Sequence, residues 1–268
     1  LAISGAVMQG LFRNPLAAPS LIGVSSGASV GASIVIVLAG TWLQNNALLG
    51  LSVVAVGAFV GSFLITLLVF RLSTSTLGTS VTTMLLAGIA ISALAGAVNS
   101  LLSYFADNEM LRQISIWQMG NLSTANWTRV SIVAVVAVFV LVLFPRESKS
   151  LNALLLGESE ARHLGIDVQR VKKKLILLTT LGIGTAVAVA GMIGFVGLIV
   201  PHMVRLLIGP DHRWLLPVSA LAGGILLLIA DTLARVIIAP VELPTGILTA
   251  ILGAPFFIML LIQQRREL

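Results

Sequence analysis

The sequence predicts an all-α polytopic membrane protein, and two observations lead to that prediction. Hydrophobic residues make up 57% of the 268 positions and charged residues only 10%, whereas soluble proteins carry about 25% charged residues. Apolar stretches of about 18 to 25 residues also recur from one end to the other, each close to the length of a membrane-spanning helix. The whole chain, residues 1–268, is therefore predicted to be one transmembrane domain rather than a soluble domain with a single anchor.

Nine apolar stretches, separated by polar or Gly/Pro-rich breaks, are the predicted helices. They cover residues 1–11, 22–40, 48–70, 80–104, 128–144, 172–190, 192–208, 214–238 and 245–263. The first has about half the length that crosses a bilayer, so we expect it to be the end of a span whose upstream part is missing. The other eight are predicted to be full spans.

The distribution of the 16 Lys and Arg residues predicts the orientation. With loops alternating between the two sides, the external side keeps only Arg112, Arg129 and Arg235. The other thirteen gather on the opposite side: Arg13, Arg71, Arg146, Lys149, Arg162, Arg170, Lys172, Lys173, Lys174, Arg205, Arg213, Arg265 and Arg266. Basic loops face the cytoplasm, so the C-terminus is predicted to be cytoplasmic. This topology also explains the net charge of +6, and we expect no nucleic-acid partner.

Three tryptophans and two long loops add detail to this topology. Trp42, Trp127 and Trp214 fall at predicted span ends, where amphipathic rings lie at headgroup level. Residues 106–127 mix charged and apolar side chains and are predicted to form a short helix on the external membrane surface, with an ordinary re-entrant connection as the alternative. Residues 145–174 on the cytoplasmic side carry leucines at helical spacing, which predicts an amphipathic helix whose apolar partner is the bundle itself or another protein.

Glycines stand one helical turn apart in two of the predicted spans. The pairs are Gly27 with Gly31 and Gly57 with Gly61. In lipid, such residues let helix backbones approach closely. We therefore interpret them as packing positions, with a pathway lining or a hinge as the alternative.

Enzymatic chemistry has little support in the sequence. The absence of cysteine excludes disulfides and thiolate metal sites. Residues 23–27 fit the G-x-S-x-G pattern of a serine nucleophile, but His163, His202 and His212 all fall near the cytoplasmic side without a carboxylate partner. We interpret residues 23–27 as a helix start, and we expect no catalytic residue, no metal site and no cofactor bound by this chain.

A phosphate-binding G-x-x-x-x-G-K-[ST] loop is also missing from the sequence. Any nucleotide energy must then come from another polypeptide, which predicts a transport subunit that works with a separate motor. A secondary transporter is the alternative, although its coupling ion calls for more intramembrane polar groups. Asp231, the acid placed within a span, stands four residues before Arg235, so a structural ion pair and a proton relay both stay open for it.

Four blocks of residues, spread over nearly the whole chain, add a family resemblance. The blocks are Gly5–Gln9 with Arg13, Asn14, Pro15 and Pro19; Leu156, Gly157 and Glu158 with Ala161, Leu164 and Gly165; Gly194–Leu198 with Pro201, His202 and Arg205; and Ala230–Thr232 with Arg235, Glu242, Pro244, Gly246 and Gly253–Pro255. In this order they resemble the signatures of the FecCD-type iron-chelate, haem and cobalamin permeases of binding-protein-dependent ABC importers.

The resemblance implies a type II ABC importer permease of ten helices, of which this chain lacks the first and part of the second. It implies a homodimer in the bacterial inner membrane, two cytoplasmic ABC ATPase subunits that bind ATP and magnesium, and a periplasmic substrate-binding protein. It assigns ATPase coupling to a segment of about 146–171, with Leu156, Gly157, Glu158, Ala161, Leu164 and Gly165 as the matching positions. Arg235 matches a position that docks the binding protein, and Arg112 is the second candidate for that role.

The cargo is less sharply indicated. Residues 116–122, Ile-Trp-Gln-Met-Gly-Asn-Leu, are similar to the F-W-x-[LM]-G-S-L segment of haem permeases, with Ile116 in place of an aromatic residue and Asn121 in place of serine. Ferric-siderophore permeases carry a comparable segment. The resemblance therefore favours a ferric siderophore or haem over cobalamin.

Overall fold

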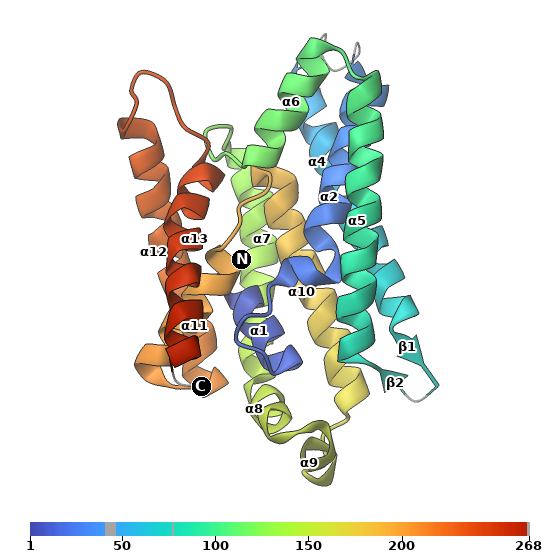
Figure 1. Cartoon of the computed structure of the whole chain (residues 1–268), viewed down its shortest axis with the longest axis vertical. Coiled ribbons are helices and arrows are strands. Elements are labelled where there is room, and N and C mark those ends of the chain that lie inside the picture. Colours follow the sequence, from blue (N-terminus) through green and yellow to red (C-terminus); the bar gives the residue numbers. More distant parts are fainter. Residues whose placement is uncertain (41–46, 77, 267–268) are drawn as a thin grey trace.

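Helices occupy all nine predicted stretches in the computed structural model, which describes residues 1–40, 47–76 and 78–266, with side chains except at 47–51, 260, 261 and 263–266. With the labels of Figure 1, the elements are α1 (Ala2–Phe12), a 3-10 turn η1 (Pro19–Ile22), α2 (Val24–Leu38), α4 (Ala47–Leu72), strands β1 (Thr74–Ser75) and β2 (Gly78–Thr79), α5 (Val81–Phe105), α6 (Asn108–Met119), α7 (Trp127–Arg146), α8 (Ser148–Leu156), α9 (Glu158–His163), α10 (Val168–Ala190), α11 (Val196–Ile208), α12 (His212–Val236) and α13 (Thr245–Arg266). The all-α membrane fold is confirmed. Trp42 lies outside the described residues.

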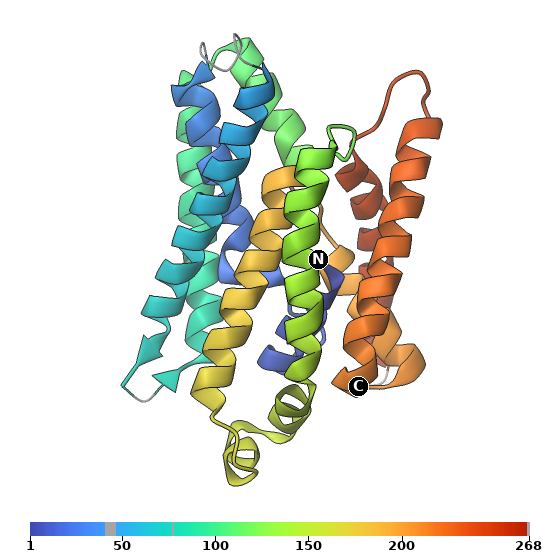
Figure 2. The same ribbon diagram turned by 180° about the vertical axis from the view of Figure 1, so that it is seen from behind.

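The helices form two groups joined by a central layer (Figure 1). α2, α4 and α5 pack together on one side, and α11, α12 and α13 pack together on the other. Between them lie α1, α7 and α10, and α7 and α10 run side by side in the reverse view (Figure 2). The short helices α8 and α9 close one end of the bundle, and the C-terminus lies toward that same end (Figure 1).

Two of the eight predicted full spans are wrong in extent. α2 has 15 residues and α11 has 13, so at 1.5 Å per residue they reach only about 20 Å. Among the described residues, five helices are long and apolar enough to cross a membrane: Ser52–Leu72, Val81–Phe105, Trp127–Arg146, Val168–Ala190 and His212–Val236. The eighth predicted span, in α13, is represented in this set only by the shorter apolar stretch Thr245–Met259. α2 and α11 start late because Gly23 and Phe195 at their N-caps adopt left-handed backbone conformations, with φ of 81° and 65°.

Neighbouring loops contact the non-helical segment before α11. Irregular backbone is tolerated at membrane depth only where protein or water satisfies its polar groups. Around the start of α11, neighbouring loops bond one another: the Asn121 N–H donates to the Ala190 carbonyl over 2.8 Å, and the Gly246 N–H donates to the Gly120 carbonyl over 3.1 Å. Three segments far apart in sequence are thereby fixed together inside the bundle.

The short helix predicted within residues 106–127 is present as α6, but its predicted place along the membrane surface is corrected. α6 begins at the cap of Asp107, whose carboxylate accepts the Met110 N–H over 2.8 Å. From there it slants from the end of the bundle toward its interior (Figure 1), packs against α2 and α13, and buries Ile114. The structure therefore agrees with the re-entrant alternative.

The glycine pairs pack as predicted. A Cβ atom at Gly31 would lie 2.1 Å from the Gly57 carbonyl oxygen, and one at Gly27 would lie 2.4 Å from that of Gly61. α2 and α4 therefore touch backbone to backbone. Any side chain at these positions would push the two helices apart.

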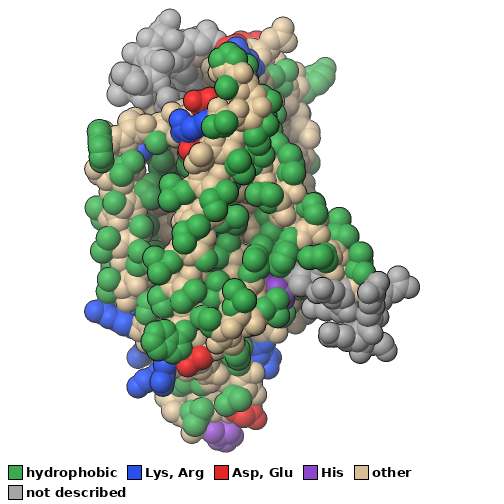
Figure 3. All heavy atoms as spheres, turned by 90° about the vertical axis from the view of Figure 1, so that its left-hand side faces the viewer, with side chains coloured by type: hydrophobic (Ala, Val, Ile, Leu, Met, Phe, Trp, Pro, Cys, Tyr) green, Lys and Arg blue, Asp and Glu red, His purple; other side chains and the backbone are tan. Residues whose placement is uncertain are grey.

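The outer surface matches a membrane protein. Hydrophobic side chains cover the middle of the face seen in Figure 3, and charged side chains gather toward the two ends. Arg112, Arg129 and Arg235 belong to elements at the end opposite α8 and α9, whereas Arg71 and Arg146 end helices on the α8–α9 side. The separation of basic residues inferred from the sequence is thus present in the fold.

Candidate functional site

A polar groove of about 700 Å³ lies on one side of the bundle, between α2, α5, α6 and the turn η1. Its lining is rich in hydroxyl and amide side chains, among them Ser25, Ser26, Ser29, Ser92, Asn99 and Gln118. Among the described residues that line it there is no Asp, Glu, Lys or Arg. The groove is therefore polar but electrically neutral.

The sequence places these groups by helical spacing. Ser25 and Ser29 are one turn apart on α2, and Ser92, Asn99 and Ser103 are separated by seven and four residues on α5, which puts each set on one helix face. The interpretation of residues 23–27 as only a helix start missed this role. The signal was hydroxyl and amide residues recurring at helical spacing within two apolar stretches.

Hydrogen bonds across the groove connect its walls. The Ser26 and Ser92 hydroxyls are 3.1 Å apart, joining α2 to α5. The Asn99 side-chain N–H donates to the Ser29 hydroxyl over 3.0 Å, and Gln118 from α6 donates to the same hydroxyl over 3.4 Å. The Asn99 Oδ1 has no hydrogen-bond partner in the described part of the protein. A neutral lining of this kind offers hydrogen bonds to a passing solute without holding an ion tightly.

The segment at the α8–α9 end is two short helices rather than the one predicted amphipathic helix. The chain breaks at Gly157, whose φ of 130° only glycine adopts readily. Leu151, Leu154 and Ala161 are buried against the bundle, so part of the predicted apolar face has its partner within this chain.

The rest of that apolar face is open. Leu155, Leu156 and Leu164 are 38%, 69% and 65% exposed. Of the six positions assigned to ATPase coupling by resemblance, Leu156 and Leu164 can therefore contact a partner directly. Ala161 is buried, and Gly157 forms the break between α8 and α9. Gly165 has a φ of 80° in the turn after α9, where a left-handed residue ends the helix.

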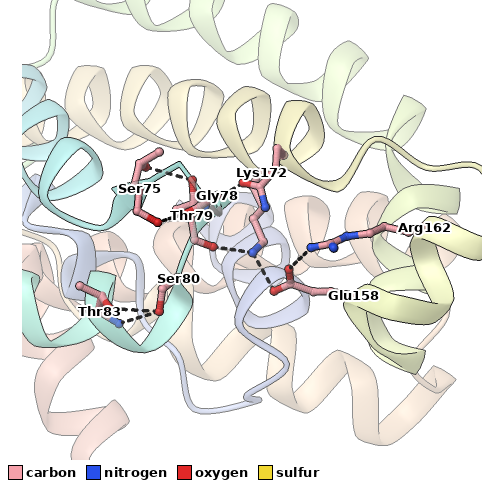
Figure 4. Close-up of polar contacts among 10 residues, drawn as sticks. Ser75, Gly78, Thr79, Ser80, Thr83, Glu158, Arg162 and Lys172 are labelled. Atoms are coloured by element: carbon pink, nitrogen blue, oxygen red, sulfur yellow. Dashed lines mark hydrogen bonds and ion pairs between the residues drawn. The ribbon is translucent and has the colours of Figure 1, made fainter.

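Glu158 points toward its own chain. Its carboxylate lies 2.7 Å from the Nζ of Lys172 on α10 and 3.8 Å from the Arg162 guanidinium (Figure 4). The Lys172 side chain is only 2% exposed, and it also donates to the Thr79 carbonyl over 2.7 Å. Glu158 thus fixes the start of α9 onto α10.

At the opposite end, Arg235 belongs to a small ion cluster. Its Nε lies 2.8 Å from Asp231 and its guanidinium lies 3.6 Å from Glu242, while the Thr245 hydroxyl donates to Asp231 over 3.1 Å. Of the two roles left open for Asp231, a structural ion pair and a proton relay, the structure contains the ion pair with Arg235. Pro244 directly precedes α13 in the same corner. Arg112 is exposed on α6 with no ion pair among the described residues, so of the two docking candidates it is the unpaired one.

The remaining signature residues organise the bundle. Gln9 is buried, and its amide donates to the Leu198 carbonyl over 2.9 Å, joining α1 to α11. Arg13 ends α1 with a φ of 51°, and the Asn14 side chain accepts the Leu16 N–H over 2.9 Å. Pro15 continues that turn.

On α11, the signature residues Pro201 and His202 are both buried. His202 is 7% exposed, and its Nδ1 has no hydrogen-bond partner in the described structure. Neither residue lines the polar groove.

Comparison with known proteins shows to which family this architecture belongs. A model of the FecCD transport family matches residues 1–263. The chain belongs to this family. The resemblance found in the sequence is therefore confirmed, and the protein is a membrane permease of the ABC-transporter type.

Similar proteins within the family differ in their cargo. The chain is 48% identical over 267 residues to the hemin transport system permease protein HmuU of Yersinia pestis, covering all of this chain and 79% of HmuU. It is 47% identical over 268 residues to the cobalamin import system permease protein BtuC of Halobacterium salinarum, covering 97% of this chain and 68% of BtuC. A metal-chelate type ABC transporter solved in an inward-facing conformation superposes with a TM-score of 0.88 at 35% identity, covering 98% of this chain and 81% of that one.

Proposed function

We propose that this chain is the membrane subunit of a bacterial inner-membrane importer that moves haem or another large iron chelate. A second copy completes the path, two ABC ATPase subunits bind the α8–α9 end on the cytoplasmic side, and a periplasmic binding protein delivers the cargo at the other end. ATP and magnesium are bound by the ATPase subunits. Membership of the FecCD family supports this arrangement.

The polar groove is the observation that carries the proposal. Its hydroxyl and amide groups lie on helices that are otherwise apolar, and the groove opens to the outside of this chain. Lipid tails cannot hydrogen-bond such groups, and leaving them unsatisfied in hydrocarbon costs several kcal/mol each. A second copy facing the first across a two-fold axis would enclose both grooves in one water-filled path.

The exposed leucines support a separate motor. Leu156 ends α8 and Leu164 follows α9, so both lie at the end of the bundle that α8 and α9 close (Figure 1). Apolar side chains in such a place favour burial against another protein. An ATPase subunit bound there would act on α8 and α9 directly.

The cargo is inferred from where the haem-like segment lies. Residues 116–122, which resemble haem permeases, include Gln118, and Gln118 lines the groove and donates to Ser29. The 48% identity to HmuU supports a haem-like iron chelate. Cobalamin is the second candidate because the identity to BtuC is nearly as high, at 47%.

Uptake by the full-length complex tests this function. The complex of permease and ATPase is placed in lipid vesicles with binding protein, and uptake of labelled haem, cobalamin and several ferric siderophores is measured with and without ATP. We expect ATP-dependent uptake of one iron chelate. Uptake that persists without ATP and collapses with a protonophore would instead identify a secondary transporter.

A groove variant connects the activity to this site. Asn99→Leu places an apolar side chain in the groove and should reduce uptake, while Ser131→Leu is the matched control on α7. Ser131 is exposed and donates to the Trp127 carbonyl of its own helix over 2.8 Å. Equal uptake by the two variants would argue against the groove as the path.

A further inference from the structure

Three consecutive lysines begin the buried part of α10, and the structure separates them. Lys173 is exposed, and Lys174 is 42% exposed beside Glu147. Lys172 is only 2% exposed. In the sequence all three lysines are interpreted alike, as basic residues that mark the cytoplasmic side. Only the fold shows that Lys172 differs from the other two.

Lys172 joins the start of α9 to strand β2. Its Nζ donates to Glu158 at the start of α9 and to the Thr79 carbonyl in β2, each over 2.7 Å (Figure 4). Gln169, one turn earlier on α10, accepts the Thr79 N–H over 2.8 Å. Both backbone groups of Thr79 are thus held by α10. Gly78 permits this approach, because a Cβ there would lie 2.4 Å from the Gln169 amide.

The two joined elements lead to the two candidate functional surfaces. α9 belongs to the end where Leu156 and Leu164 are exposed. Strand β2 ends at Thr79, two residues before α5 begins, and α5 carries Ser92 and Asn99 of the groove. A continuous path therefore runs from α9 through Lys172 to the start of a groove helix.

We propose that Lys172 is a positioning residue that transmits movement of α9 to α5 during transport. The inference rests on the proposed function, in which an ATPase acts on α8 and α9. A solvated ion pair could break and re-form as α9 moves. Separation from Glu158 would leave the buried ammonium without a counter-charge, and separation from the Thr79 carbonyl would cost a hydrogen bond to a charged group. We therefore expect α9 and the hairpin before α5 to move together.

The main test compares substitutions at adjacent lysines in the full-length complex. Lys172→Met keeps the length and apolar stem of the side chain but removes its charge, and Lys173→Met is the matched control. We expect Lys172→Met to retain assembly and ATP hydrolysis but to lower uptake about tenfold, a coupling effect of ordinary size. Lys172→Arg should recover part of the uptake, and Lys173→Met should match the parent protein.

A second measurement follows the movement itself. The chain has no cysteine, so single cysteines introduced at the exposed positions Thr74 and Ser159 carry spin labels on the hairpin and on α9. In the parent protein we expect the distance between these labels to stay constant when ATP binds. With Lys172→Met, or with Gln169→Leu if Lys172→Met fails to assemble, that distance should change with nucleotide.

The outcomes separate this inference from the proposed function. Loss of uptake and ATP hydrolysis in the same proportion would overturn it, because that is the result of a merely structural role. Equal uptake by Lys172→Met and Lys173→Met would also overturn it. So would a label distance that responds to nucleotide in the same way in the parent protein and in Lys172→Met. A parent complex without ATP-driven uptake would instead contradict the proposed function.

Discussion

Gly31→Ala tests the backbone contact between α2 and α4. The added Cβ would lie 2.1 Å from the Gly57 carbonyl oxygen and 3.2 Å from the Gly61 Cα. The helices must separate by roughly 1 Å to restore ordinary van der Waals contact. Neither obstacle is the end of a flexible side chain, so the backbone itself has to move.

The expected loss of stability follows from two opposing effects. Overpacking costs about 1–3 kcal/mol, while replacing a helical glycine by alanine contributes about 0.5–1 kcal/mol in the other direction. A net loss of about 1–2 kcal/mol is expected, equivalent to a Tm lower by about 2–8 °C for a chain of this size. α2 also carries Ser29, so uptake should fall with the altered spacing.

Thermal unfolding of the purified protein in detergent checks this prediction, with Gly224→Ala as the control. A Cβ at Gly224, which is exposed on α12, meets nothing within 4 Å, so the same substitution there should leave Tm unchanged or raise it. An unchanged Tm for Gly31→Ala, or an equal decrease for both variants, would refute the reasoning about the α2–α4 contact.

Three further predictions concern the ends of the bundle. Leu156→Asp, at a position 69% exposed, should leave folding intact and weaken binding of the ATPase about tenfold in a pull-down titration; unchanged binding would place the ATPase elsewhere. Arg235→Gln should leave Tm nearly unchanged, because its ion pairs are exposed to solvent, but should reduce the stimulation of ATP hydrolysis by the binding protein. Hydrogen bonds from the Arg213 backbone N–H and the Asn152 side chain lower the pKa of the Asp211 carboxyl. The ionised carboxylate therefore stabilises the fold above its unfolded pKa of about 3.9. This stabilisation is lost as the pH falls through the lower pKa of the folded state. Asp211→Ala should therefore lower Tm at pH 7, by a margin that shrinks toward pH 3, and a margin independent of pH would contradict this account.

Hydropathy predicts the long helices of this protein closely. Residues 80–104 and 128–144 were expected as spans, and the helices are Val81–Phe105 and Trp127–Arg146. Such helices expose much of their length to lipid, so their composition alone marks them. The late starts of α2 and α11 escape this method, because residues such as Phe195 are apolar whether or not their backbone is helical.

The candidate site was only partly predictable for a related reason. Family signatures indicated the α8–α9 segment but did not separate exposed Leu156 from buried Ala161. The groove requires that serines on α2 face an asparagine on α5, about seventy residues later. The partner of Glu158 was equally hidden, because tertiary burial alone distinguishes Lys172 from its two neighbours.

The neutral lining of the groove has a consequence for selectivity. Under the proposed function, the described lining offers neither a fixed charge nor a metal ligand to distinguish one large solute from another, so selection of the cargo would fall to the binding protein that delivers it. Exchanging that binding protein, rather than redesigning the groove, would then be the simpler way to engineer a transporter for a new cargo.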